Sequence, residues 1–263
     1  MFALIILIAS TKLLAYQVMA MECGVPLVQP TPRKSVKAVG KGMTPWMGKV
    51  IMDDADEGPT VTLVRHPKKL NYIRTIAVTS YLAASDMMKR IENDVSRLRV
   101  HFDLYDVKDA VEGAPNTYSV KAVILESQAS SDDALLHFAV VVLNEEVDAT
   151  PLCFPYPSSI VDFSSASTCF MSGYENLGGK SGFDLRYKKL AVKDPSNCPI
   201  DVDPKTEICT DNYRCKADDG SPFQCKIGDK WYIAGIRDRG IACNAFVNVS
   251  SSENFIMKNM FSL

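Results

Sequence analysis

Short stretches of apolar and β-branched residues recur along the chain, and turn residues separate them. Stretches of this length and spacing predict the strands of a β-barrel or β-sandwich. Helical periodicity is clear in Asn254–Phe261 and weaker in Ser85–Val95. The pattern therefore predicts an all-β protein with a C-terminal helix. The predicted strands are Thr60–Val64, Ile73–Tyr81, Arg97–Phe102, Ser119–Leu125, Leu135–Leu143, Phe183–Val192, Lys230–Ile236 and Ala245–Val249.

Composition limits the classes of partner. The chain has 263 residues, of which 47% are hydrophobic, enough for one domain with a large core or for two small ones. Its net charge is −2, and no long block of one sign occurs. Such a chain has no general field that would attract nucleic acid or an anionic membrane, so neither is expected as a partner.

The N-terminal stretch differs from the rest. Phe2–Ser10 is apolar but too short to span a bilayer, and a second apolar stretch ends at Val18–Ala20. The residues at its end suit signal-peptidase cleavage after Ala20, although no basic residue precedes the first apolar run. We expect residues 1–20 to be a signal peptide of a secreted, extracellular protein. The alternative is a buried N-terminal helix.

Eight cysteines follow the predicted signal peptide. An even number in a secreted chain predicts disulfides, and a zinc site is the alternative. No Cys-x-x-Cys pair occurs and no histidine lies near the cysteines, so neither a metal nor another cofactor is expected. Residues 21–37 form a Pro-rich, basic linker that precedes the first strands.

Five segments, in order, have the form of motifs from a single family. They are Ala38–Gly40 with Thr44–Trp46, Tyr81–Ser85, Asp132–Leu136 with Pro151–Pro155, Cys169–Tyr174, and Cys215–Pro222 with Trp231–Ile236 and Arg239–Cys243. With them the chain resembles the trypsin/chymotrypsin family of serine proteases. The family's corresponding motifs include Ala-Ala-His, Asp-Ile-Ala-Leu-Leu and Cys-x-Gly-Asp-Ser-Gly-Gly-Pro. Together the segments cover nearly all of residues 23–263.

The resemblance implies a fold and a set of disulfides. The fold is two packed antiparallel β-barrels, at about 38–143 and 158–250, within one domain of residues 38–263 that ends in a helix. The implied bridges use all eight cysteines. They are Cys23–Cys153, Cys169–Cys225, Cys198–Cys209 and Cys215–Cys243.

The resemblance also implies a defective catalytic centre. The family needs a nucleophilic serine, a histidine base and an orienting aspartate. The matching positions here are Asp219, Ser85 and Asp132, so only the aspartate is kept. The oxyanion-hole positions are Ala217 and Asp219, and a carboxylate there would repel an oxyanion. The three histidines of the chain are expected to be ordinary surface or core residues: His66, His101 and His137.

The implied substrate pocket and activation site are altered as well. Tyr213 and Arg214 stand at the pocket base, where Tyr213 is expected to fill the space; a reshaped peptide pocket is the alternative. In the pocket wall, where the family has Ser-Trp-Gly, this chain has Asp238, Arg239 and Gly240. Cleavage after Lys37 would free Ala38, whose amine would pair with Asp218 in an activated family member.

Two surface features have less specific interpretations. Asn248 opens a glycosylation sequon. Arg65–Lys69 and Arg74 form a basic cluster, interpreted as a solvated loop or as an exosite for acidic partners.

We therefore expect a monomeric, non-catalytic protease homologue that binds proteins, among them proteases or acidic proteins, in a proteolytic or immune setting. An active trypsin-like endopeptidase with an atypical site is the alternative, and a gene product without a selected role is a third reading.

Overall fold

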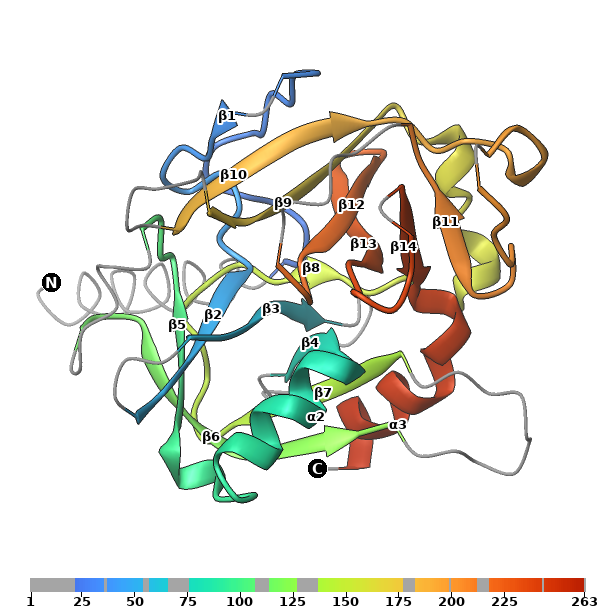
Figure 1. Cartoon of the computed structure of the whole chain (residues 1–263). Helices are drawn as coiled ribbons and strands as arrows, with labels where there is room; N and C mark the ends of the chain where they lie inside the picture. The colour runs from blue at the N-terminus through green and yellow to red at the C-terminus, as the bar shows by residue number, and fades with distance from the viewer. Residues whose placement is uncertain are drawn as a thin grey trace, which may run out of the picture.

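The computed structural model describes residues 22–35, 37–53, 57–65, 76–106, 114–126, 137–176, 183–198, 200–211, 218–242 and 244–262. The β-strands among these residues are joined in one hydrogen-bonded system (Figure 1). The structure is mostly β, and the predicted C-terminal helix is present.

The first half of the chain forms a closed six-stranded barrel. Around the barrel the strand order is β2, β3, β4, β7, β6 and β5, and β5 pairs with β2 again. The pairing is antiparallel throughout. The bounds are β2 Met47–Met52, β3 Glu57–Arg65, β4 Ile76–Ser80, β5 Leu98–Phe102, β6 Thr117–Leu125 and β7 Phe138–Leu143.

The second half is a curved run of antiparallel strands, coloured yellow to red in the upper part of Figure 1. Its order is β10, β9, β12, β13, β14 and β11, and an isolated bridge between Val192 and Thr210 brings the two ends of the run together. The bounds are β9 Thr168–Asn176, β10 Phe183–Leu190, β11 Glu207–Cys209, β12 Pro222–Ile227, β13 Lys230–Ile236 and β14 Ala245–Asn248.

Two short strands connect the parts. β8 (Leu152–Cys153) lies between β3 and β13 and runs parallel to both, so it joins the barrel to the second half. β1 (Lys37–Ala38) is exposed and pairs with β10. One apolar core extends through both halves; at its centre Trp231 packs edge-on against Phe170 with 4.9 Å between ring centroids.

The helices depart in detail from the prediction for Ser85–Val95. α2 spans Tyr81–Arg90, because the Ser80 side chain accepts a hydrogen bond from the Ala83 N–H and caps the helix at the end of β4. It ends before Glu92 and Asn93, which both have positive φ. α3 spans Glu253–Ser262. Short 3-10 turns occupy Val95–Arg97, Ser158–Ile160, Phe163–Ser165, Pro195–Asn197 and Val249–Ser252. No helix in the described part of the chain is long and apolar enough to cross a membrane.

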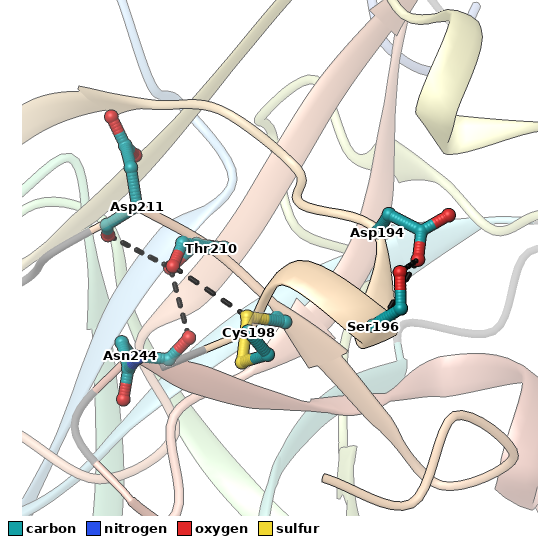
Figure 2. The surroundings of a disulfide bond; sticks show 7 residues. Asp194, Ser196, Cys198, Thr210, Asp211 and Asn244 are labelled. Carbon is teal, nitrogen blue, oxygen red and sulfur yellow. Dashed lines mark hydrogen bonds between the residues drawn. A yellow bond between two sulfur atoms is a disulfide. The ribbon is translucent and has the colours of Figure 1, made fainter. Parts of the chain in front are cut away.

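Three of the four implied disulfides are present: Cys23–Cys153, Cys169–Cys225 and Cys198–Cys209. Cys215 and Cys243 lie outside the described residues. Figure 2 shows the Cys198–Cys209 bridge, with Thr210 donating to the carbonyl of Asn244 at 3.1 Å and Asp194 capping the turn at Ser196. These three bridges indicate an oxidising, extracellular environment.

Peptide mapping of the protein under non-reducing conditions tests the remaining pair. We expect a Cys215–Cys243 peptide in addition to the three bridges above, because two thiols left over in an oxidising compartment would pair. A free thiol at either residue, or a mixed bridge that includes Cys198, would contradict the implied pattern.

Candidate functional site: the Asp218–Asp219 turn

The turn of Asp218, Asp219 and Gly220 lies between β3 and β13 and leads into β12. Its backbone is held from both sides, since the Thr60 N–H donates to the Asp219 carbonyl at 3.1 Å and the Gly220 N–H donates to the Arg237 carbonyl at 2.8 Å. Gly220 has a φ of 84°, and an added Cβ would lie 2.0 Å from the Thr60 carbonyl oxygen. Only glycine fits this position, so the chain must approach β3 closely here.

The Asp218 carboxylate is enclosed by donors. One oxygen is ion-paired with the Lys49 ammonium and accepts the Thr60 hydroxyl at 2.7 Å. The other oxygen accepts the Ser221 hydroxyl at 2.9 Å and the Tyr174 N–H at 3.3 Å. With four donors the carboxylate is fully satisfied inside the protein.

Lys49 is the cation of this pair, and its side chain is only 3% exposed. It comes from the middle of β2, and its ammonium also lies 5.5 Å from the centroid of the Tyr174 ring. A buried lysine is tolerated only where a carboxylate compensates its charge. Lys49 and Asp218 therefore neutralise each other at the contact between the two halves.

The predicted processing site lies elsewhere. Lys37 and Ala38 form the exposed strand β1, paired with Tyr187 and Arg186 of β10. The Val39 N–H continues this pairing, donating to the Leu185 carbonyl at 3.0 Å. In this uncleaved chain the partner of Asp218 is Lys49, and Ala38 is held on the surface.

Asp219 is the residue at the implied nucleophile position. Its side chain is 16% exposed, and its carboxylate lies 3.7 Å from the Arg239 guanidinium. Burial raises the pKa of Asp219 to about 6, and the neighbouring Asp238 adds to the effect, whereas Arg239 and Arg237 oppose it. The group is therefore close to half-protonated in mildly acidic solution.

Arg239 links the turn to α2. Besides its contact with Asp219, its guanidinium forms an ion pair with Asp86 in the second turn of the helix. This side chain thus spans the space between the end of β13 and the first barrel. The predicted pocket-wall residue is fixed by carboxylates on both sides.

Asp238 is also committed to internal bonds. It is buried and accepts the Ser80 hydroxyl at 2.5 Å and the Gly240 N–H at 2.6 Å. Arg237, before it, donates to the carbonyls of Asp238 and Ile241. Of the three predicted wall residues, Asp238 and Gly240 are thus bonded to each other, whereas Arg239 is held by Asp86 and Asp219.

His137 lies behind this cluster. It is buried, its backbone N–H donates to the Glu126 carboxylate at 3.1 Å, and its carbonyl accepts from the Tyr81 N–H. Burial lowers the pKa of the imidazole, and Asp238 and Glu126 oppose this effect. Its ring Nε2 has no hydrogen-bond partner among the residues that the structure describes. Of these two carboxylates, Asp238 has the larger effect on the pKa of His137. Within the described residues the ion-pair partner of Asp219 is Arg239, and no imidazole is bonded to it.

The other predicted site residues divide into two groups. Ser85 lies half-buried in α2, and within the described residues no hydrogen bond joins it to Asp219. Asn248 caps the Val249–Ser252 turn by accepting the Ser250 N–H at 3.0 Å, and its glycosylation stays a prediction. The remaining members fall outside the described residues: Asp132, Tyr213, Arg214, Ala217 and His66.

Sequence reasoning missed Lys49, Thr60 and the Asp86–Arg239 pair. A signal for Lys49 existed, since a lone lysine in the apolar stretch Met47–Met52 indicates a buried charge that requires a partner. The partner itself could not be read from the sequence, because Asp218 is 169 residues away. Among the described residues no three His, Cys, Asp or Glu side chains gather as metal ligands.

Comparison with known proteins agrees with this architecture. The family model for trypsin matches residues 91–251, which is more than half of the chain. The chain belongs to the trypsin family. The match includes the Asp218–Asp219 turn, so this turn lies within the part of the chain that the family model covers.

Its curated relatives are distant. Atrial natriuretic peptide-converting enzyme from Rattus norvegicus is 24% identical over 58% of this chain and 16% of its own length. Inactive CLIP domain-containing serine protease A3 from Aedes aegypti is 25% identical over 68% of this chain and 44% of its own length. The chain thus spans less than half the length of these relatives, and their names include both an enzyme and an inactive protein.

The first test of the site removes the cation. Lys49→Met should lower the free energy of unfolding by about 3–5 kcal/mol, because it leaves the Asp218 charge buried without compensation. Adding Asp218→Asn should restore more than about 1 kcal/mol relative to the sum of the single changes. Chemical denaturation measures all four proteins, with exposed Lys121→Met as the matched control. Additive single effects would contradict a direct pair.

The second test uses the pKa of Asp219. Its folded-state pKa is raised, so between about pH 4 and pH 6 the folded protein binds more protons than the unfolded chain, and stability falls as the pH rises. Asp219→Asn removes this effect. A pKa raised from 3.8 to about 6 corresponds to at most roughly 3 kcal/mol in favour of the variant at pH 7.5.

Denaturation of wild type and variant at each pH isolates this contribution, because the titration of His137 is common to both. Exposed Asp229→Asn is the matched control for the loss of one charge. A stability difference that stays constant from pH 4 to pH 7.5 would show that Asp219 ionises normally.

Proposed function

We propose that this chain is a secreted, non-catalytic member of the trypsin family that acts by binding another protein. The observation that carries the proposal is the carboxylate of Asp219, which stands at the turn where the family has its nucleophile and is ion-paired with Arg239. A carboxylate at this point repels the oxyanion that peptide hydrolysis must stabilise.

The surrounding contacts support the same proposal. Asp218 already has its cation in Lys49, so an amine freed at Ala38 would have to displace a buried ion pair to reach it. Arg239 is tied to Asp86 on α2 and to Asp219, and this bridge crosses the region where a substrate backbone would lie beside β13. Productive positioning of a peptide would require these bonds to break.

The setting of the proposal is extracellular and proteolytic or immune. The disulfides favour an oxidising compartment, and one distant relative is named an inactive serine protease. Residues 1–20 would act as signal peptide, residues 158–250 would complete a second closed barrel, and the mature chain would be a monomer. Its partners would be proteases or acidic proteins.

The rival proposal is an active endopeptidase with an atypical site. It is favoured by the raised pKa of Asp219, since a carboxyl that titrates near neutral pH can act as a general acid or base. Asp238 lies close enough to influence that pKa, so a pair of carboxylates would be the machinery. The two proposals differ in whether purified protein turns over a substrate.

Purified mature protein should hydrolyse neither peptide esters nor amides above background, with or without trypsin cleavage after Lys37. It should not react with a fluorophosphonate probe, because that reagent traps an activated serine and position 219 is an aspartate. Installing Ser85→His and Asp219→Ser together should still give little activity, since Arg239 remains bonded to Asp86.

The control for this experiment is a fluorophosphonate-reactive trypsin assayed in parallel. Turnover by the unmodified protein that is abolished by Asp219→Ala would overturn the binding proposal and favour the carboxylate mechanism.

A further inference from the structure

A cavity of about 490 Å³ opens on the second half, where the N-terminal linker crosses the strands. Its walls are the linker residues 29–33, Ser167 and residues of β9, β10, β12 and β13. None of these lining residues belongs to the Asp218–Asp219 turn or bonds to it, so the cavity is a separate feature. Its size is within the range of small-ligand sites.

Three cations line this cavity. Arg33 comes from the linker, Lys189 from β10 and Lys226 from β12, and no carboxylate is among the lining residues. The chain as a whole has a net charge of −2, so the positive charge is a local property of the cavity. Within the described residues none of these three side chains takes part in an ion pair.

Backbone pairing joins the elements that carry the three cations. The Lys189 N–H donates to the Arg33 carbonyl at 2.8 Å, which fixes the linker against β10. Lys226 is paired in register with Thr168 of β9, another lining residue. Like charges gathered at one concave surface repel one another, and a bound anion relieves that repulsion. The arrangement is therefore suited to an anionic ligand.

The remaining walls indicate which kind of anion fits. Hydroxyls come from Thr31, Ser167 and Thr168, an apolar side is made by Pro30 and Pro32, and the buried Trp231 lies beneath them. Trp231 is fixed in place, since its indole N–H donates to the Gln29 side chain at 3.4 Å. Cations and hydroxyls beside an apolar wall can bind the sulfates, hydroxyls and ring faces of a sugar.

An acidic peptide fits these walls less well. Extended peptides bind by backbone hydrogen bonds to a free strand edge, and acidic motifs bind to clusters of arginines, whereas this cavity has the single arginine Arg33. Here the prolines have no N–H to donate, and the Arg33 carbonyl is already used by Lys189. Side-chain groups are what the cavity offers, and these suit a sulfated saccharide.

We propose that the cavity lined by Arg33, Lys189 and Lys226 binds a sulfated polysaccharide segment. Three convergent cations with no competing carboxylate supply the affinity, and the linker is part of the site. This binding is independent of whether the Asp219 centre is catalytic.

The test is titration of the mature protein with a heparin-derived sulfated tetrasaccharide, followed by calorimetry and tryptophan fluorescence. We expect saturable binding that weakens with salt. The variant Arg33→Gln/Lys189→Gln/Lys226→Gln should bind at least about 10-fold more weakly, a loss of roughly 1.4 kcal/mol. A matched control, Lys121→Gln/Lys193→Gln/Lys205→Gln, removes the same charge from exposed positions outside the cavity and should bind like the wild type.

Two further ligands test whether the cavity recognises the sulfate groups of the sugar rather than negative charge in general. A desulfated tetrasaccharide should not bind, and an acidic peptide of equal charge should bind more weakly than the sulfated sugar. Equal losses in the two triple variants would overturn the proposal in favour of diffuse attraction. Tighter binding of the acidic peptide, or no binding of the tetrasaccharide by the wild type, would also overturn it. Unchanged thermal unfolding of the cavity variant establishes that it is folded.

Discussion

The buried ion pair between Lys49 and Asp218 is the constraint around which the centre of this molecule is arranged. Lys49 belongs to the first barrel, whereas Asp218 precedes β12 of the second half, so the pair also joins the two. A pair of this kind stabilises little relative to an apolar contact, but losing one partner is costly. Any arrangement of β2 and the turn that separated Lys49 from Asp218 would bury a lone charge.

Next to this neutral pair, the other charges of the site form a separate chain. Arg239 connects Asp86 to Asp219, and Asp238 takes its donors from Ser80 and Gly240. The Lys49–Asp218 pair ties the turn to β2, whereas Arg239 ties it to α2 through Asp86. In this trypsin-family chain the acidic side chains around the turn are thus satisfied by cations and donors of the protein itself, and the proposed binding role rests on this arrangement.

Much of the fold could be predicted from the sequence, but the site only in part. The prediction for Lys230–Ile236 matches the bounds of β13, because this segment is a short run of apolar and aromatic residues and Gly228 and Asp229 mark the turn before it. β2 was missed, since all its residues are buried and no alternation remains to be seen. The family motif located Asp218 and Asp219, yet it could not reveal their partners. The contacts of Asp218 with Lys49 and Thr60 join residues more than 150 positions apart, and the contact of Asp219 with Arg239 spans the β12–β13 pair, whereas single-sequence patterns report only local structure.

The way the turn is anchored has a consequence for how such a protein changes over generations. Its course is set by main-chain bonds from Thr60 and Arg237 and by the close approach at Gly220, none of which involves the side chain at position 219. Replacing that side chain therefore alters charge and chemistry while the loop keeps its path. A lineage could lose or exchange its reactive group in one step and retain a folded scaffold, leaving the surfaces of the protein free to acquire new ligands.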